Sequence, residues 1–104
     1  MSRYRVSFTP IAESQIIEAY EWGVDNWGPE QAERWLRALY ASIFSRLNEF
    51  PLSCSIAPET EDVSREIRQH LFNRYRILFE VRDSEVRVLK LTGPFDRLDV
   101  SLSE

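Results

Sequence analysis

Arg74-Tyr-Arg-Ile-Leu-Phe-Glu-Val-Arg82 alternates charged and apolar residues, and Val86-Arg-Val-Leu-Lys-Leu91 repeats the alternation a few residues later. Successive side chains of a strand point to opposite faces of its sheet. One face of the middle strand therefore carries Tyr75, Ile77, Phe79 and Val81, and the other carries Arg74, Arg76, Glu80 and Arg82. The pattern predicts strands at roughly 64–71, 74–82 and 85–92, in an antiparallel sheet with helices on one face and solvent or a partner on the other.

A further strand and a first helix are predicted near the N-terminus. Arg3 to Phe8 alternates polar and apolar residues, as a strand with one buried face does. Thr9-Pro10 then forms a typical helix start, because threonine caps a helix and proline is tolerated at its first position. We expect this helix to run to about Trp22 and to be broken by residues 23–28, which include two glycines.

A second helix is expected to begin at Pro29 and to end at Phe50-Pro51, and residues 51–62 are a loop by composition. The aromatic residues near the helix junction are expected to pack in the core and the turn; they are Tyr20, Trp22, Trp27 and Trp35. The predicted order is strand–helix–helix–strand–strand–strand, an α+β fold. In it, an N-terminal helical hairpin packs on one face of a small, antiparallel-rich sheet.

The composition fits a soluble protein with one domain, residues 1–104. Its 43% hydrophobic and 29% charged residues are ordinary for a globular protein, and no apolar run is long enough to cross a bilayer. The single cysteine excludes an intrachain disulfide. These features together indicate a reduced, cytoplasmic protein.

Basic residues concentrate in the predicted strands, although the chain as a whole has a net charge of −4. Residues 63–82 contain five Arg against only Glu66 and Glu80. The planar guanidinium of arginine suits bidentate recognition of phosphate or carboxylate. These arginines therefore form either a surface for an anionic partner or a solvated strand face with local ion pairs. The acidic total argues against a general nucleic-acid binder.

The sequence lacks the common motifs of cofactor and metal sites. Its three glycines are isolated, so it has no glycine-rich phosphate loop, and one histidine with one cysteine cannot form a zinc cluster. We see no carboxylate cage for another metal. We therefore expect neither a metal nor a cofactor. His70 is either an ordinary strand histidine or a residue that contacts a target phosphate.

Three stretches in order carry a family resemblance: Tyr4-Arg-Val-Ser-Phe-Thr9, the helix start Pro10-Ile-Ala, and Arg65-Glu-Ile-Arg68 followed by Tyr75-Arg-Ile-Leu-Phe-Glu-Val81. With them the chain resembles, over nearly its whole length, the RelE/ParE superfamily of bacterial toxin–antitoxin toxins. RelE-like members cut messenger RNA in the ribosomal decoding site, using basic residues on the sheet and a Tyr or His near the C-terminus. ParE-like members generally lack that set, and characterised ones poison DNA gyrase.

Departures from the RelE-like pattern favour the ParE-like branch. After residue 75 the chain keeps Arg97 but has no His or Tyr. RNA cleavage needs a general base and a general acid, and arginine stays protonated at neutral pH. If the chain were a ribosome-dependent nuclease, the resemblance would assign catalysis to Arg65, Arg68, His70, Arg76 and Arg97. We expect instead a non-enzymatic toxin that blocks DNA gyrase or a related target; a non-toxic, degenerate member is the remaining alternative.

The resemblance also implies a cognate antitoxin as partner, in a hetero-oligomeric complex. An apolar groove beside the helices and the basic sheet would receive it, with antitoxin carboxylates paired to Arg65, Arg68, Arg76 and Arg82. Alternation places Arg76 and Arg82 on one face, and strand register, which the sequence leaves open, decides whether Arg65 or Arg68 joins them. We expect an Arg65→Ala, Arg76→Ala double variant to stay largely folded while losing toxicity or antitoxin affinity.

Overall fold

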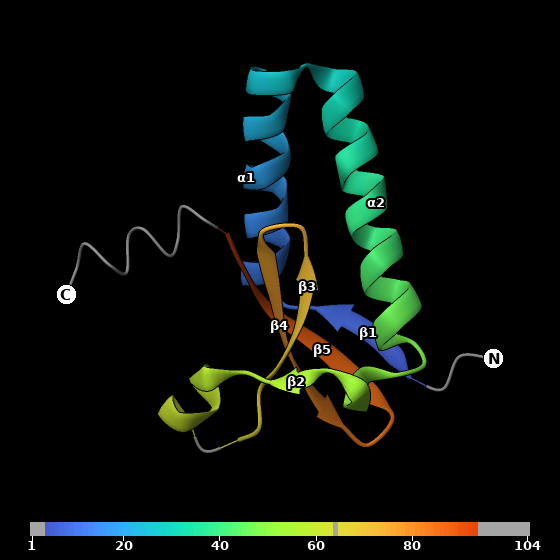
Figure 1. Ribbon diagram of the computed structural model, residues 1–104, viewed down its shortest axis with the longest axis vertical. Helices are drawn as coiled ribbons and strands as arrows, with labels where there is room; N and C mark the ends of the chain where they lie inside the picture. Colours follow the sequence, from blue (N-terminus) through green and yellow to red (C-terminus); the bar gives the residue numbers. More distant parts are fainter. Residues whose placement is uncertain (1–3, 64, 94–104) are drawn as a thin grey trace.

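Two helices pack against one face of a five-stranded sheet in the part of the chain that the structure, a computed structural model, describes, residues 4–63 and 65–93. The helices are α1 (Pro10–Trp27) and α2 (Pro29–Leu47). The strands are β1 (Arg5–Phe8), β2 (Ser55–Ile56), β3 (Arg68–Phe72), β4 (Tyr75–Arg82) and β5 (Glu85–Thr92). The predicted α+β fold with an N-terminal helical hairpin is confirmed (Figure 1).

The sheet has the order β1-β5-β4-β3-β2 and is antiparallel except where β1 pairs in parallel with β5. Tight turns join β3 to β4 at Asn73 and β4 to β5 at Asp83, both with positive φ, which short polar side chains tolerate better than most residues. The second and third predicted strands are confirmed to within a residue. The first was predicted too long, because β3 begins at Arg68.

The first helix is five residues longer than predicted, because Gly23 does not break it. A Cβ at Gly23 would lie 3.1 Å from the ring of Trp27 and 3.3 Å from Cβ of Ala32, so this glycine permits close packing between the helices. The break falls at Gly28 alone, which has a φ of +95° and separates α1 from α2. The predicted start is confirmed, since the Ala12 amide donates to Oγ1 of Thr9 at 3.1 Å.

Residues 51–62 are more ordered than the predicted loop. They form a 3₁₀ turn (Pro51–Ser53), the edge strand β2 and a second 3₁₀ turn (Pro58–Asp62). The chain then returns across the sheet face that is turned away from the helices, here called the outer face. Residues 57–63 and 65–67, the covering segment, bury Ala57 and Ile67 against Leu78 of β4 there. Part of the face predicted to meet solvent or a partner is therefore covered by the chain itself.

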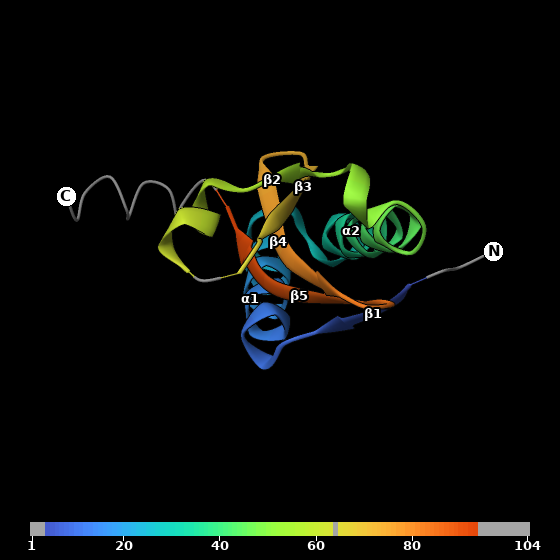
Figure 2. The same ribbon diagram turned by 90° about the horizontal axis from the view of Figure 1, so that it is seen from below.

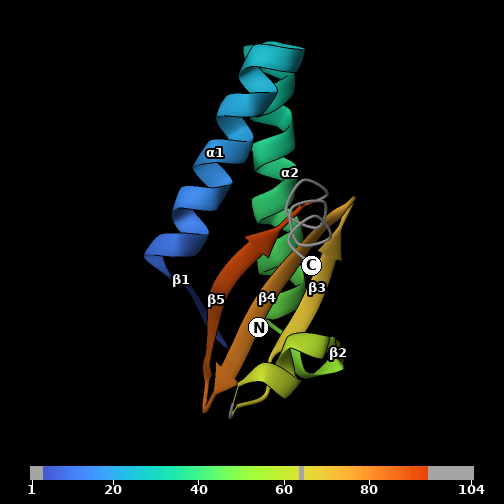
Figure 3. The ribbon, with the colours of Figure 1, turned by 90° about the vertical axis from the view of Figure 1, so that its left-hand side faces the viewer.

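The main core lies between the helices and the opposite, inner face of the sheet. Ile16 of α1 and Leu39 and Ile43 of α2 are fully buried against Ile77 and Phe79 of β4. The apolar face predicted for the middle strand is thus confirmed. Seen from the side, β5, β4 and β3 stand in front of the helices, and the closed end of the helical hairpin projects beyond the strands (Figure 3).

β1 lies near the helix ends that are remote from Gly28 (Figure 1), and the view nearly along both helices shows it running beside β5 (Figure 2). The ring of Phe8 in β1 contacts the rings of Tyr40 and Phe44 in α2, with centroids 5.6 and 5.9 Å away. The backbone amide of Tyr4 also donates to the carbonyl of Asn48, just after α2, at 3.0 Å. These contacts fix one end of the hairpin and leave the Gly28 end free of the sheet. Neither α1 nor α2, the helices of the described residues, is long and apolar enough to span a membrane.

Candidate functional site

Strand register decides which of the predicted arginines share a face. Arg68 of β3 lies opposite Phe79 and therefore points to the inner side of the sheet. Its Nη1 donates to the carbonyl of Cys54 at 2.6 Å and to that of Leu52 at 3.3 Å, and its Nη2 lies 3.2 Å from Glu66. Arg68 thus holds the chain around β2 in place and is absent from the outer face.

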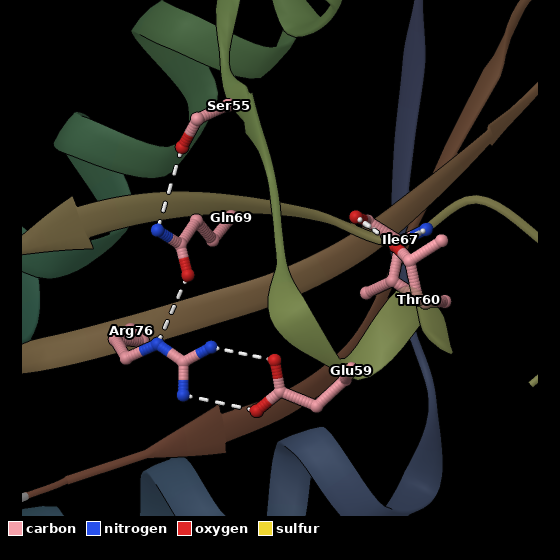
Figure 4. Close-up of polar contacts among 6 residues, drawn as sticks. All are labelled: Ser55, Glu59, Thr60, Ile67, Gln69 and Arg76. Atoms are coloured by element: carbon pink, nitrogen blue, oxygen red, sulfur yellow. Dashed lines mark hydrogen bonds and ion pairs between the residues drawn. The ribbon is translucent and has the colours of Figure 1, made fainter. Parts of the chain in front are cut away.

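Arg76 lies on the outer face and is already paired. Its two terminal nitrogens donate to the two carboxylate oxygens of Glu59 at 2.6 and 3.0 Å, and its Nε donates to Oε1 of Gln69 at 3.0 Å (Figure 4). Glu59 belongs to the covering segment and Gln69 to β3. Hydrogen bonding from Arg76 holds the pKa of the Glu59 carboxyl below its ordinary value, although partial burial opposes the shift.

Arg65 pairs with the second acidic residue of this face. Its Nε lies 3.2 Å from Glu80 of β4, whose side chain is only 9% exposed. Arg82, at the end of β4, is exposed and makes no ion pair within the described residues. Of the four arginines predicted to meet an antitoxin, three therefore have an acceptor inside the chain. The alternative of local ion pairs on a strand face describes Arg65 and Arg76 in this state.

His70 faces the inner side of the sheet, opposite Ile77. Its Nε2 lies 2.8 Å from Oγ of Ser42 on α2, at hydrogen-bonding distance. Burial lowers the pKa of His70, and the nearby positive charge of Arg46 lowers it further. The ring therefore favours its neutral form between helix and strand. Arg97, the remaining residue of the nuclease alternative, lies outside the described residues.

Two hollows, here together called the groove, lie where the helical hairpin leaves the sheet. One hollow, of about 240 Å³, lies between α1 and the end of β5 and is lined by Trp22, Tyr75 and Leu91, among others. The second, of about 410 Å³, lies between α2 and the end of β3, and its lining includes Trp27 and Trp35. Both have apolar walls with a few polar groups, as binding sites commonly do.

Aromatic rings connect the tip of the hairpin to this groove. Trp22 contacts Trp27 with centroids 5.4 Å apart, Trp27 contacts Trp35 at 6.5 Å, and Trp35 contacts Tyr75 at 5.5 Å. Trp35 packs against the core as predicted, but Trp22 and Trp27 remain 41% and 45% exposed. The helical spacing of these residues predicted their burial, but it could not show that the helices extend beyond the end of the sheet. The sequence also gave no sign that Glu59, in the predicted loop, would pair with Arg76.

The topology and the helical hairpin are those of chains from two solved toxin–antitoxin systems. A chain of the chromosomal ParDE toxin–antitoxin system of P. aeruginosa matches it with a TM-score of 0.73 and 17% identity, over 88% of this chain and 96% of that one. A chain of the RelBE2 toxin–antitoxin complex of Mycobacterium tuberculosis matches with a TM-score of 0.64 and 21% identity, over 89% and 93%.

The particular family follows from the sequence. The family model for the ParE toxin of the type II toxin–antitoxin system parDE matches residues 6–92, and the chain belongs to this family. No curated protein matches the chain in sequence. The predicted RelE/ParE resemblance, closer to the ParE-like branch, is thereby confirmed, and the protein is a toxin of a type II toxin–antitoxin pair.

Proposed function

We propose that this toxin acts in the cytoplasm by binding DNA gyrase or a related target, without cutting RNA. The observation that carries the proposal is the separation of His70 from Arg76, two of the residues that the nuclease alternative requires. His70 turns inward to Ser42, whereas Arg76 turns outward to Glu59. A general base must act within hydrogen-bonding reach of the substrate that the cationic groups hold. With the histidine and this arginine on opposite faces of the sheet, one ribose phosphate cannot meet both.

The exposed aromatic residues favour an activity based on protein binding. Trp, Tyr and Arg are enriched among the residues that contribute most to protein–protein affinity. Trp22 and Trp27 are half exposed at the projecting end of the hairpin, and Arg34 lines the hollow next to Trp27. This end of the molecule is therefore the surface that we assign to contacts with other proteins.

The antitoxin is proposed to bind across the same groove. Its apolar side chains would fill the two hollows, and its carboxylates would pair with Arg82, which makes no ion pair within the described residues. Pairing with Arg65 or Arg76 would require displacement of Glu80 or Glu59. Arg68 would not contact the antitoxin; from the inner side of the sheet it holds the backbone at Leu52 and Cys54 in place.

Pulse-labelling of DNA and protein synthesis in bacteria, after induced expression without antitoxin, tests the proposed target. We expect DNA synthesis to fail first while protein synthesis continues. A His70→Gln variant should remain toxic, because the proposal gives His70 no chemical role. An early stop in protein synthesis that His70→Gln abolishes would instead establish the ribosome-dependent nuclease.

A further inference from the structure

On the outer face of the sheet, polar side chains that take no part in the ion pair between Arg76 and Glu59 lie on the strand beside Arg76. Thr92 of β5 lies directly opposite Arg76, and Lys90 lies opposite Leu78, so both side chains share the face of Arg76. The positive charge of Lys90 also contributes to the lowered pKa of Glu59. Two cations, Arg76 and Lys90, therefore act on the Glu59 carboxylate, and Oε1 of Gln69 accepts from Nε of Arg76 and so orients the guanidinium group.

Thr92 is the group in this cluster that the fold leaves unsatisfied. The residue is 7% exposed, and its Oγ1 is buried without a hydrogen-bond partner. A buried hydroxyl without a partner costs free energy that most native structures avoid. Thr92 lies opposite Arg76 in the sheet, so its hydroxyl is a further hydrogen-bond donor beside the guanidinium group.

We propose that Arg76, Gln69, Lys90 and Thr92 form a carboxylate-binding site, which Glu59 of the same chain occupies until an acidic side chain of a partner protein replaces it. The inference deepens the proposed function, on which the choice of a protein as partner rests. The site itself is a property of the isolated chain. It makes Glu59 an internal competitor that weakens premature or non-specific contacts with the arginine.

Geometry and charge favour a carboxylate over a nucleic-acid phosphate. The site already holds a carboxylate in the bidentate arrangement that guanidinium groups prefer. The chain as a whole is acidic, with a net charge of −4. This net charge repels a phosphate chain, with its repeated negative charges, more than a single side-chain carboxylate.

Glu59 can leave the site without unfolding the segment that carries it. The covering segment is held through its backbone, because the Ala57 amide donates to the Ile67 carbonyl at 2.7 Å. Thr60 Oγ1 both donates to the Ile67 carbonyl and accepts from the Ile67 amide, each at 2.9 Å. The Glu59 side chain is 38% exposed and takes no part in these bonds. Its short tether nevertheless gives it a high effective concentration, so a free anion competes poorly with it.

Sodium acetate, titrated into the full chain at constant ionic strength and followed through the Arg76 Nε–Hε NMR signal, tests the site. We expect Glu59→Ala to bind acetate about tenfold more tightly than the wild-type chain, because the internal competitor is gone. Glu61→Ala is the matched control: it removes an exposed acid from the same turn and should leave acetate binding at the wild-type level. Adding Arg76→Gln to Glu59→Ala should abolish the gain.

Two results would overturn the proposal: equal acetate affinity in Glu59→Ala and Glu61→Ala, or tighter binding of inorganic phosphate than of acetate by Glu59→Ala. If Glu59→Ala is unfolded, Glu59→Gln removes the charge at nearly constant volume and must show the same order of affinities. The titration needs neither antitoxin nor gyrase. Its failure is therefore distinguishable from a failure of the proposed function, which the labelling experiment tests in cells.

Discussion

At the scale of single residues, His70 shows how the helical layer packed on a sheet determines the role of a strand side chain. Both readings allowed by the sequence, an ordinary strand histidine or a phosphate contact, were compatible with its position between arginines. The choice depends on the face it occupies, and that depends on pairing with β4. The hydrogen-bond partner of His70 is Ser42, which lies 28 residues earlier in the sequence, on α2. The strand pattern does not specify how this helix is oriented on the sheet.

We predict that the stability of the protein falls as the pH is lowered below about 6.5, the ordinary pKa of histidine. Burial lowers the pKa of His70 in the folded chain, so the unfolded chain binds more protons over this range. The stabilisation is fully present above the unfolded-state pKa and is lost as the pH falls through the folded-state value. Urea unfolding between pH 7.5 and 5.5 measures it.

Since His70 is the one histidine of the chain, His70→Gln should flatten this part of the stability profile. Glutamine keeps a polar group that can reach Ser42 but has no charge to gain. An unchanged slope in the variant would show that other groups produce the pH dependence.

Among the elements, those with a strong local pattern were predicted well. β4 and β5 alternate strictly and α2 has regular apolar spacing, so their existence follows from burial on one face. Gly23 was misread because its role, close approach to Ala32, is a contact between two helices. The covering segment was missed for the same reason: the bond from Arg76 to Glu59, which ties it to the sheet, joins residues 17 positions apart in the sequence.

Arg65 has a structural role in the covering segment that changes its expected mutational effect. Removing it leaves the Glu80 carboxylate, 9% exposed, without its ion pair. We predict that Arg65→Ala lowers the free energy of unfolding by about 1–3 kcal/mol, as loss of a hydrogen bond to a buried charge does. We therefore now expect the Arg65→Ala, Arg76→Ala double variant to be less stable than the wild-type chain, rather than largely intact in its folding.

Arg82→Ala is the matched control, because Arg82 is exposed and without an ion pair in the described part of the chain. Its free energy of unfolding should stay within about 0.5 kcal/mol of the wild-type value. Denaturant unfolding of the two variants provides the comparison. Equal stability would mean that Glu80 finds another cation, of which Arg87, opposite it on β5, is the nearest in register.

For the molecule as a whole, the helical hairpin is longer than the sheet it packs on, and this mismatch creates the surface that we assign to protein binding. Gly93 illustrates how the sheet end of the groove is shaped: a Cβ there would lie 2.6 Å from the Tyr75 ring. The absence of a side chain at Gly93 leaves room for the ring of Tyr75, which lines the first hollow. All three tryptophans lie at this end of the molecule, so one spectroscopic signal reports on the surface that we assign to the antitoxin.

We predict that binding of the antitoxin shifts the tryptophan emission to shorter wavelength and protects it from quenching by acrylamide, because Trp22 and Trp27 lose their exposure. Trp22→Ala and Trp27→Ala should each weaken the complex by about tenfold or more, the effect expected of aromatic residues at the centre of an interface. Phe50→Ala is the control: Phe50 is exposed as well, but it follows the opposite end of α2. The antitoxin would bind elsewhere on the toxin if Trp22→Ala and Trp27→Ala bound it with full affinity and if its binding left the tryptophan emission of the wild-type chain unaltered.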